Sequence, residues 1–136
     1  MSGWTIRDAR PDDLTQMMTI LDAALLDIEA TEVRAACGPG SRRWAFIAVA
    51  DDRVLGTLVL AATRIEAIAV RRARRGQGIG SALVDRACRA HPSVTARCDG
   101  AVRPFYESMD FDCHRIGPDR YACHRSSWGG VASGSG

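Results

Sequence analysis

The sequence contains no lysine and no asparagine, so all 18 of its basic residues are arginine. Without lysine, the chain has no side-chain amine that could form a Schiff base. It also cannot carry the glycine-lysine-serine/threonine signature of a P-loop nucleotide site. The 16 acidic residues leave a net charge of only +2. Any strong attraction for anions must therefore come from a local group of arginines.

Long apolar runs are also missing. No run approaches the roughly 18 residues of a membrane-spanning helix, and residues 1–8 lack the charged-then-apolar start of a secretion signal. The five cysteines include no C-x-x-C pair, and an odd number suits a secreted disulfide framework poorly. We therefore expect reduced thiols, a cytoplasmic location and no membrane contact.

Aromatic residues make up only 6% of the chain. Together with the near-neutral charge, this scarcity argues against a nucleic-acid-binding surface, which combines a basic face with stacking aromatics. The length of 136 residues and the apolar fraction of 46% suit one domain with one core. We expect this domain to span residues 1–126, followed by a flexible tail rich in glycine and serine at 127–136.

The spacing of apolar residues predicts a mixed α/β domain. Spacings of three and four from Leu14 to Ile28 predict a helix, and a second helical piece extends to Ala36. Two further helices are expected at Ile79–Ala90 and Val102–Met109. Strands are expected at Trp4–Ala9, Trp44–Ala50, Val54–Ala62, Ile65–Val70, Ser93–Cys98, Phe111–Ile116 and Arg120–Arg125.

The most informative stretch connects the strand that ends at Val70 to the helix that begins at Ile79. Four arginines fall within residues 71–75, and glycines occupy positions 76, 78 and 80. Glycines let backbone N–H groups approach an anion closely, and a helix N-terminus attracts negative charge. The stretch therefore predicts a phosphate cradle, with Arg75 pointing partly inward and the other arginines outward. The alternative is a solvated turn.

Two common phosphate loops do not fit this stretch. A P-loop needs the missing lysine, and a dinucleotide fingerprint needs G-x-G-x-x-G inside a βαβ unit. Here the third glycine, Gly80, comes one position too early. What remains is residues 75–80, Arg-Gly-Gln-Gly-Ile-Gly, which match R/Q-x-x-G-x-G/A at a strand-to-helix junction.

With this motif and a second block at Ala101–Phe111, the chain resembles the GCN5-related N-acetyltransferase (GNAT) superfamily from Thr5 to Arg125. The resemblance implies a central, mostly antiparallel mixed sheet of six to seven strands flanked by about four helices. The second block departs from the family pattern at Asp110, where glycine is usual. Aspartate tolerates the left-handed backbone conformation expected there.

The resemblance implies an acetyl-CoA-dependent N-acetyltransferase that moves the acetyl group directly to a primary amine, with no metal. Strand residues would hold the pantetheine arm of acetyl-CoA, and the glycine loop would hold its pyrophosphate. The donor-binding residues implied are Ile68, Ala69, Val70, Arg75, Gly76, Gln77, Gly78, Ile79, Gly80 and Ser81.

Tyr106 resembles the general acid of the family. A phenol is protonated at neutral pH and can give its proton to the departing thiolate. The alternative is a buried aromatic whose hydroxyl only caps a backbone group.

Glu66 is the candidate general base, acting through water, because it is one of only four glutamates and lies in an apolar strand. Strict alternation would place Glu66, Ile68 and Val70 on one face of that strand, and Ile65, Ala67 and Ala69 on the other. The alternative is an ion pair with Arg64 or another arginine.

The acceptor is not identified by the sequence; a small molecule and a protein terminus both fit, as do a monomer and a homodimer. A catalytically weak acyl-CoA-binding sensor is the alternative function. Cys113-His114 and Cys123-His124 do not predict a metal site, because neighbouring strand residues point to opposite faces. Trp44 is expected in the core.

Overall fold

The computed structural model describes residues 3–24, 26, 28–38 and 42–126. The predicted tail at 127–136 lies outside these residues. The helices are α1 (Leu14–Ala23), α2 (Ala30–Ala36), α3 (Ile79–Ala90) and α4 (Arg103–Ser108), with short 3-10 helices η1 (Pro11–Asp13) and η2 (Arg72–Arg74). The strands are β1 (Thr5–Asp8), β2 (Arg43–Ala50), β3 (Arg53–Ala61), β4 (Arg64–Val70), β5 (Ser93–Cys98), β6 (Asp112–Gly117) and β7 (Arg120–Ser126).

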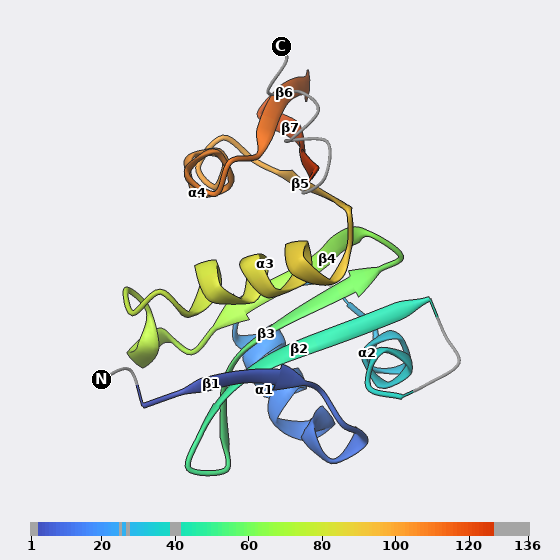
Figure 1. The fold of residues 1–136 in the computed structure, drawn as a ribbon, viewed down its shortest axis with the longest axis vertical. Helices are drawn as coiled ribbons and strands as arrows, with labels where there is room; N and C mark the ends of the chain where they lie inside the picture. The colour runs from blue at the N-terminus through green and yellow to red at the C-terminus, as the bar shows by residue number, and fades with distance from the viewer. Residues whose placement is uncertain (1–2, 25, 27, 39–41, 127–136) are drawn as a thin grey trace.

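The strands form one seven-stranded sheet in the order β1-β2-β3-β4-β5-β7-β6. Every neighbouring pair is antiparallel except β4 and β5, which are parallel and are connected through α3. This is the mixed, mostly antiparallel sheet that the sequence predicted. Figure 1 shows β5, α4, β6 and β7 grouped together at one end of the molecule, away from β1 to β3.

The core has two parts, one on each face of the sheet. On one face, Leu83 and Val84 of α3 pack with Tyr106 of α4 and with the sheet. On the other, Met17 and Leu21 of α1 and Val33 of α2 cover the strands. Burial on both faces explains the nearly continuous apolar runs of β2 and β3.

Helix α1 is shorter than its apolar pattern predicts. The helix ends at Ala23, and the N–H of Leu26 donates to the Leu21 carbonyl at 3.2 Å in the turn that follows. Leu26 and Ile28 still pack against the α1-side core, from an irregular segment. The apolar spacing therefore predicted correctly that Leu26 and Ile28 pack against the core, but it predicted too long a helix.

Trp44 is 43% exposed, so its expected place in the core is wrong. Its ring meets the ring of His91 edge-on, with the centroids 5.0 Å apart. His91 follows the last residue of α3, and the pair therefore forms a contact between β2 and the end of that helix.

Strand β4 contains a β-bulge at Glu66. The register pairs Val59 with Ala67 but Leu60 with Ile65, which leaves Glu66 as an extra residue. Ile65 therefore joins the α3-side core, whereas Ala67 lies on the α1 side. The predicted strict alternation along this strand is wrong, because one inserted residue reverses the faces that precede it.

The bulge lies where β4 and β5 separate. The register between these strands pairs Arg64 with Thr95 and Ile65 with Ala96, both before the bulge. Among the residues in the structure, no ladder pair joins the two strands after it. A gap within the sheet thus separates the later half of β4 from β5.

Candidate active site

The loop after β4 forms an open cradle at the N-terminus of α3. Gly76 and Gly78 have φ angles of 83° and 84°, in the left-handed region where glycine is favoured. No heavy atom lies within 4 Å of a Cβ built on either glycine. No side chain caps the first turn of α3, so its leading N–H groups remain available to a ligand.

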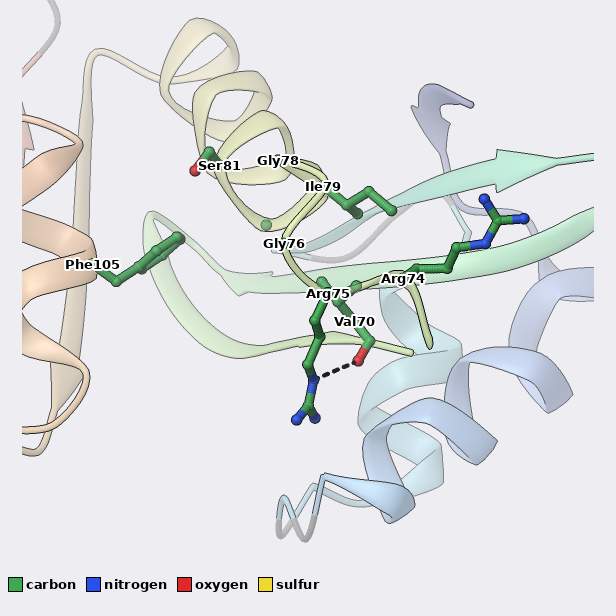
Figure 2. A pocket seen from close by; sticks show the side chains of 9 residues that line it. Val70, Arg74, Arg75, Gly76, Gly78, Ile79, Ser81 and Phe105 are labelled. Carbon is green, nitrogen blue, oxygen red and sulfur yellow. Dashed lines mark hydrogen bonds between the residues drawn. The ribbon is translucent and has the colours of Figure 1, made fainter. Parts of the chain in front are cut away.

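A cavity of about 270 Å³ lies at this cradle, lined by the loop, by Val70 and by Phe105. Figure 2 shows Phe105 of α4 across this space from the start of α3, while Arg74 and Arg75 extend from the loop in different directions. Open backbone donors, a helix N-terminus and nearby arginines suit a diphosphate.

The arginine held closest to the fold is Arg71, not Arg75 as expected. The Nε of Arg71 donates to the Val54 carbonyl at 2.6 Å, and this side chain is half-buried. Burial, and then the charge of Arg53, lower the pKa of Arg71. Arg75 is exposed, with its Nε 3.4 Å from the Val70 carbonyl. Arg71 therefore anchors the end of β4, and Arg75 stays at the rim of the cradle.

A second cavity, of about 300 Å³, lies between β4 and β5 and is lined by Glu66, Ile68, Cys98 and Tyr106 among others. Tyr106 is only 3% exposed. Its ring packs edge-on against Phe105 and Phe111, with both centroid distances 5.2 Å. Within the described part of the chain, its hydroxyl has no hydrogen-bond partner. Tyr106 thus brings a free O–H group to this cavity.

Burial raises the pKa of Tyr106 to about 12, with a smaller contribution from Cys98. The phenol consequently stays protonated throughout the neutral range and can act as a proton donor. Consecutive residues of α4 serve the two cavities, since Phe105 lines the cradle and Tyr106 lines the gap.

Glu66 lines the gap cavity and is also ion-paired. Its carboxylate contacts the guanidinium of Arg43, and its Oε2 lies 3.8 Å from Arg64. Arg43 in turn lies 3.4 Å from Glu32 of α2. The ion-pair alternative weighed for Glu66 is therefore present, and its role as a base stays a prediction.

The other predicted donor-binding residues are distributed unevenly. Ile68 lines the gap cavity, whereas Val70 and residues 78–81 of the loop and helix line the cradle. The Ala69 side chain is buried in the α1-side core, which leaves only its backbone for a ligand. Gln77 is exposed and lines neither cavity.

Several residues at these sites were not expected from the sequence, Phe105 and Arg43 among them. Phe105 could have been found, because it precedes Tyr106 in the same motif. Arg43 could not, since it reaches Glu66 only through the pairing of β2, β3 and β4.

Two of the five cysteines form a disulfide, which corrects the expectation of reduced thiols throughout. Cys113 and Cys123 face each other directly in the β6–β7 register and are bonded. That register is not readable from the sequence. Cys37, Cys88 and Cys98 are buried and are not disulfide-bonded in the structure.

The structure contains no membrane-length apolar helix and no group of three potential metal ligands among the residues it describes.

The family model described as an acetyltransferase (GNAT) domain matches residues 41–113, which is more than half of the chain. The match runs from the start of β2 through the cradle and Tyr106 to β6. A search of curated protein sequences found no match.

Solved structures of low sequence identity share the fold. An aminoglycoside 6'-N-acetyltransferase complexed with coenzyme A has a TM-score of 0.75 at 17% identity, over 90% of this chain and 97% of that one. Ard1 from Thermoplasma volcanium has a TM-score of 0.71 at 21% identity, over 91% and 97% of the two chains. NAA60 from Arabidopsis thaliana in complex with acetyl-CoA has a TM-score of 0.72 at 15% identity, over 89% and 96%.

Because the family model spans the cradle, the bulged strand and the motif around Tyr106, the chain belongs to the GNAT acetyltransferase family.

Proposed function

We propose that this protein binds acetyl-CoA and transfers its acetyl group directly to a primary amine, with no covalent enzyme intermediate. One observation carries the proposal: consecutive residues of α4, Phe105 and Tyr106, line the glycine cradle and the β4–β5 gap respectively. This arrangement supports a proposal in which the glycine loop binds a diphosphate beside a protonated phenol.

The donor would lie along these two cavities. The pyrophosphate would take the open N–H groups around Gly78 and at the start of α3. The pantetheine arm would take the backbone of Ile68, Ala69 and Val70, which borders the gap where β4 leaves β5. Such an arm is an extended amide chain and can add to a strand edge with unpaired donors and acceptors.

Tyr106 would act when the carbon–sulfur bond of the thioester breaks. The acceptor amine attacks the carbonyl carbon, a tetrahedral intermediate forms, and collapse of this intermediate expels the thiolate. The Tyr106 hydroxyl donates its proton to that sulfur and later recovers one from solvent. A pKa of about 12 keeps the hydroxyl in its donating form at neutral pH.

The attacking amine must lose a proton, and we propose that Glu66 takes it through a water molecule. Among the described residues, the carboxylates that line the gap cavity are those of Glu66 and Asp99. Asp99 already accepts the Val102 N–H at 3.0 Å, which holds the turn before α4. Glu66 projects from β4 itself, although its pairing with Arg43 and Arg64 would weaken it as a base.

The proposed acceptor is a small amine or a protein N-terminus. The similar structures include an aminoglycoside 6'-N-acetyltransferase, which supports a small-molecule acceptor. A cytoplasmic location and a monomeric or homodimeric state stay predictions. Because stable disulfides are uncommon in the cytosol, the oxidation state of Cys113 and Cys123 in cells tests the location directly.

Calorimetry with acetyl-CoA, followed by an amine screen that measures release of free CoA, tests the function. We expect binding at micromolar concentrations and turnover with at least one class of amine. Binding without turnover on any amine would favour the acyl-CoA sensor. No binding would overturn both functions.

A further inference from the structure

Three cysteines lie together on three adjacent strands. The Sγ of Cys98 on β5 is 3.8 Å from the Sγ of Cys123 on β7, and Cys123 is bonded to Cys113 on β6. Cys98 and Cys123 are 8% and 2% exposed, whereas Cys113 is half-buried. A free thiol thus touches one sulfur of a disulfide, and the other sulfur lies nearer the surface.

Cys98 also forms part of the candidate active site. It lines the gap cavity together with Tyr106, and a negative charge on Cys98 raises the pKa of that tyrosine. Cys37 is a contrasting case: its thiol donates to the Val33 carbonyl at 3.2 Å, far along the chain from any disulfide. The Cys98 thiol therefore contacts the disulfide, and Cys98 also lines the gap cavity.

We propose that Cys98, Cys113 and Cys123 form a thiol–disulfide exchange site that extends from half-buried Cys113 to the gap cavity. The Cys98 thiol loses its proton to solvent and attacks the Cys123 Sγ. The Cys98–Cys123 bond forms, the Cys113–Cys123 bond breaks, and the electron pair leaves on the Cys113 sulfur, which takes up a proton. The exchange needs no external oxidant, because one disulfide and one thiol remain.

The ligands of this site are small thiols and disulfides, which would react at half-buried Cys113 after the exchange. The effect on acetyl transfer rests on the proposed function. Once the Cys98 sulfur is bonded to Cys123 of β7, Cys98 no longer presents a thiol to the gap cavity beside Tyr106. The exchange itself does not depend on that function.

Disulfide mapping of the oxidised wild-type protein tests the exchange without any activity measurement. The folded protein is incubated with N-ethylmaleimide, quenched at low pH at intervals and digested. Trypsin cuts after Arg97, Arg115, Arg120 and Arg125 but not at Arg103-Pro104, so Glu-C is added to cut after Glu107. Each cysteine then lies on its own peptide: 98–107, 108–115 or 121–125.

We expect peptide 108–115 to gain the label with time, while peptide 98–107 becomes linked to 121–125. In Cys98→Ser, labelling of 108–115 should fall at least tenfold, and in Cys37→Ser it should match the wild type. If 108–115 stays linked to 121–125 throughout, or labels equally fast in Cys98→Ser, the proposal is wrong.

The pH dependence gives a second measurement. Burial, then the charge of Asp99, raise the pKa of Cys98; Glu107 adds to this rise, while Arg103 and Arg120 oppose it. Thiolate is therefore scarce at neutral pH, and labelling of 108–115 should accelerate roughly tenfold per pH unit while it remains scarce. A rate independent of pH would exclude attack by the Cys98 thiolate.

The two proposals fail separately. A protein that exchanges its disulfide but does not bind acetyl-CoA would overturn the proposed function and leave the exchange site standing. If the protein acetylates amines but peptide 108–115 never takes the label, the exchange site is overturned and the proposed function stands.

Discussion

At the scale of single residues, neighbours decide what each group in the gap cavity can do. Tyr106 is enclosed by Phe105 and Phe111, which keeps the phenol neutral and leaves its hydroxyl without a partner in the described part of the chain. Glu66 instead lies among arginines of β2 and β4. The same cavity is thus lined by a neutral phenol and by a carboxylate that is ion-paired with arginines.

Replacing Tyr106 by phenylalanine should lower kcat by about 100-fold, because the departing thiolate loses its proton donor. The KM for acetyl-CoA should change little, since the ring and its packing remain. Steady-state kinetics with the best amine acceptor measure both quantities. An unchanged kcat would remove Tyr106 from the mechanism.

Replacing Glu66 by glutamine separates its two possible roles. If Glu66 is the base, the acidic limb of the pH–rate profile flattens and kcat falls. If it only pairs with Arg43 and Arg64, that limb stays and the free energy of unfolding drops by roughly 1 kcal/mol. We expect the first result; an intact acidic limb would make Glu66 structural.

At the scale of elements, the junction between β4 and α3 carries the most sequence information. Helix α3 spans the predicted residues 79–90, and β5 spans the predicted residues 93–98. The glycine spacing and the Pro92 stop act locally, so the sequence alone could specify them. The predicted left-handed conformation of Asp110 is confirmed by its φ of 67°. It was predictable because it too depends on local sequence.

A Gly78→Ala variant should weaken acetyl-CoA binding about tenfold, because a left-handed alanine costs about 1–2 kcal/mol and the loop can relieve this strain by shifting. The surrounding space would accept the methyl group, so the effect comes from the backbone. Calorimetry measures the affinity.

Gly38→Ala is the matched control for Gly78→Ala. A Cβ at Gly38 also meets no atom within 4 Å, and Gly38 has no positive φ. Its affinity for acetyl-CoA should equal that of the wild type. An equal loss in both variants would mean that the cradle geometry does not set donor affinity.

Features that depend on pairing between distant strands could not be predicted. The bulge at Glu66 is visible only when β3 and β4 are aligned, and the Cys113–Cys123 bond only when β6 and β7 are. Arg43 and Glu66 are 23 residues apart and meet because β2, β3 and β4 lie side by side. The sequence thus singled out Tyr106 and the glycine loop as candidates, but it did not indicate the partners that define the environment of Glu66.

At the scale of the whole molecule, Tyr106 connects the candidate active site to the stability of the fold. Its pKa of about 12 in the folded protein exceeds the ordinary tyrosine value of 10.0. A group whose folded pKa is raised contributes stability that is complete below the unfolded pKa and is lost as pH rises through the folded one. The loss therefore falls between about pH 10 and pH 12.

Denaturant unfolding at pH 9 and pH 11 measures this loss. The wild type should lose about 1.4 kcal/mol more than Tyr106→Phe over this interval. Other alkaline titrations that do not interact with Tyr106, such as that of buried Cys37, occur in both proteins and cancel in the comparison. Parallel losses in the two proteins would show that Tyr106 ionises as easily in the folded chain as in the unfolded one.

The gap beside β4 begins with one extra residue, Glu66, at the point where the pairing of β4 with β5 ends. Point substitutions along β4 leave peptide groups in place, so such a gap can survive extensive sequence divergence. Deleting Glu66 would instead bring the two halves of β4 into one register. We therefore expect this single deletion to close the gap, which point substitutions would leave open.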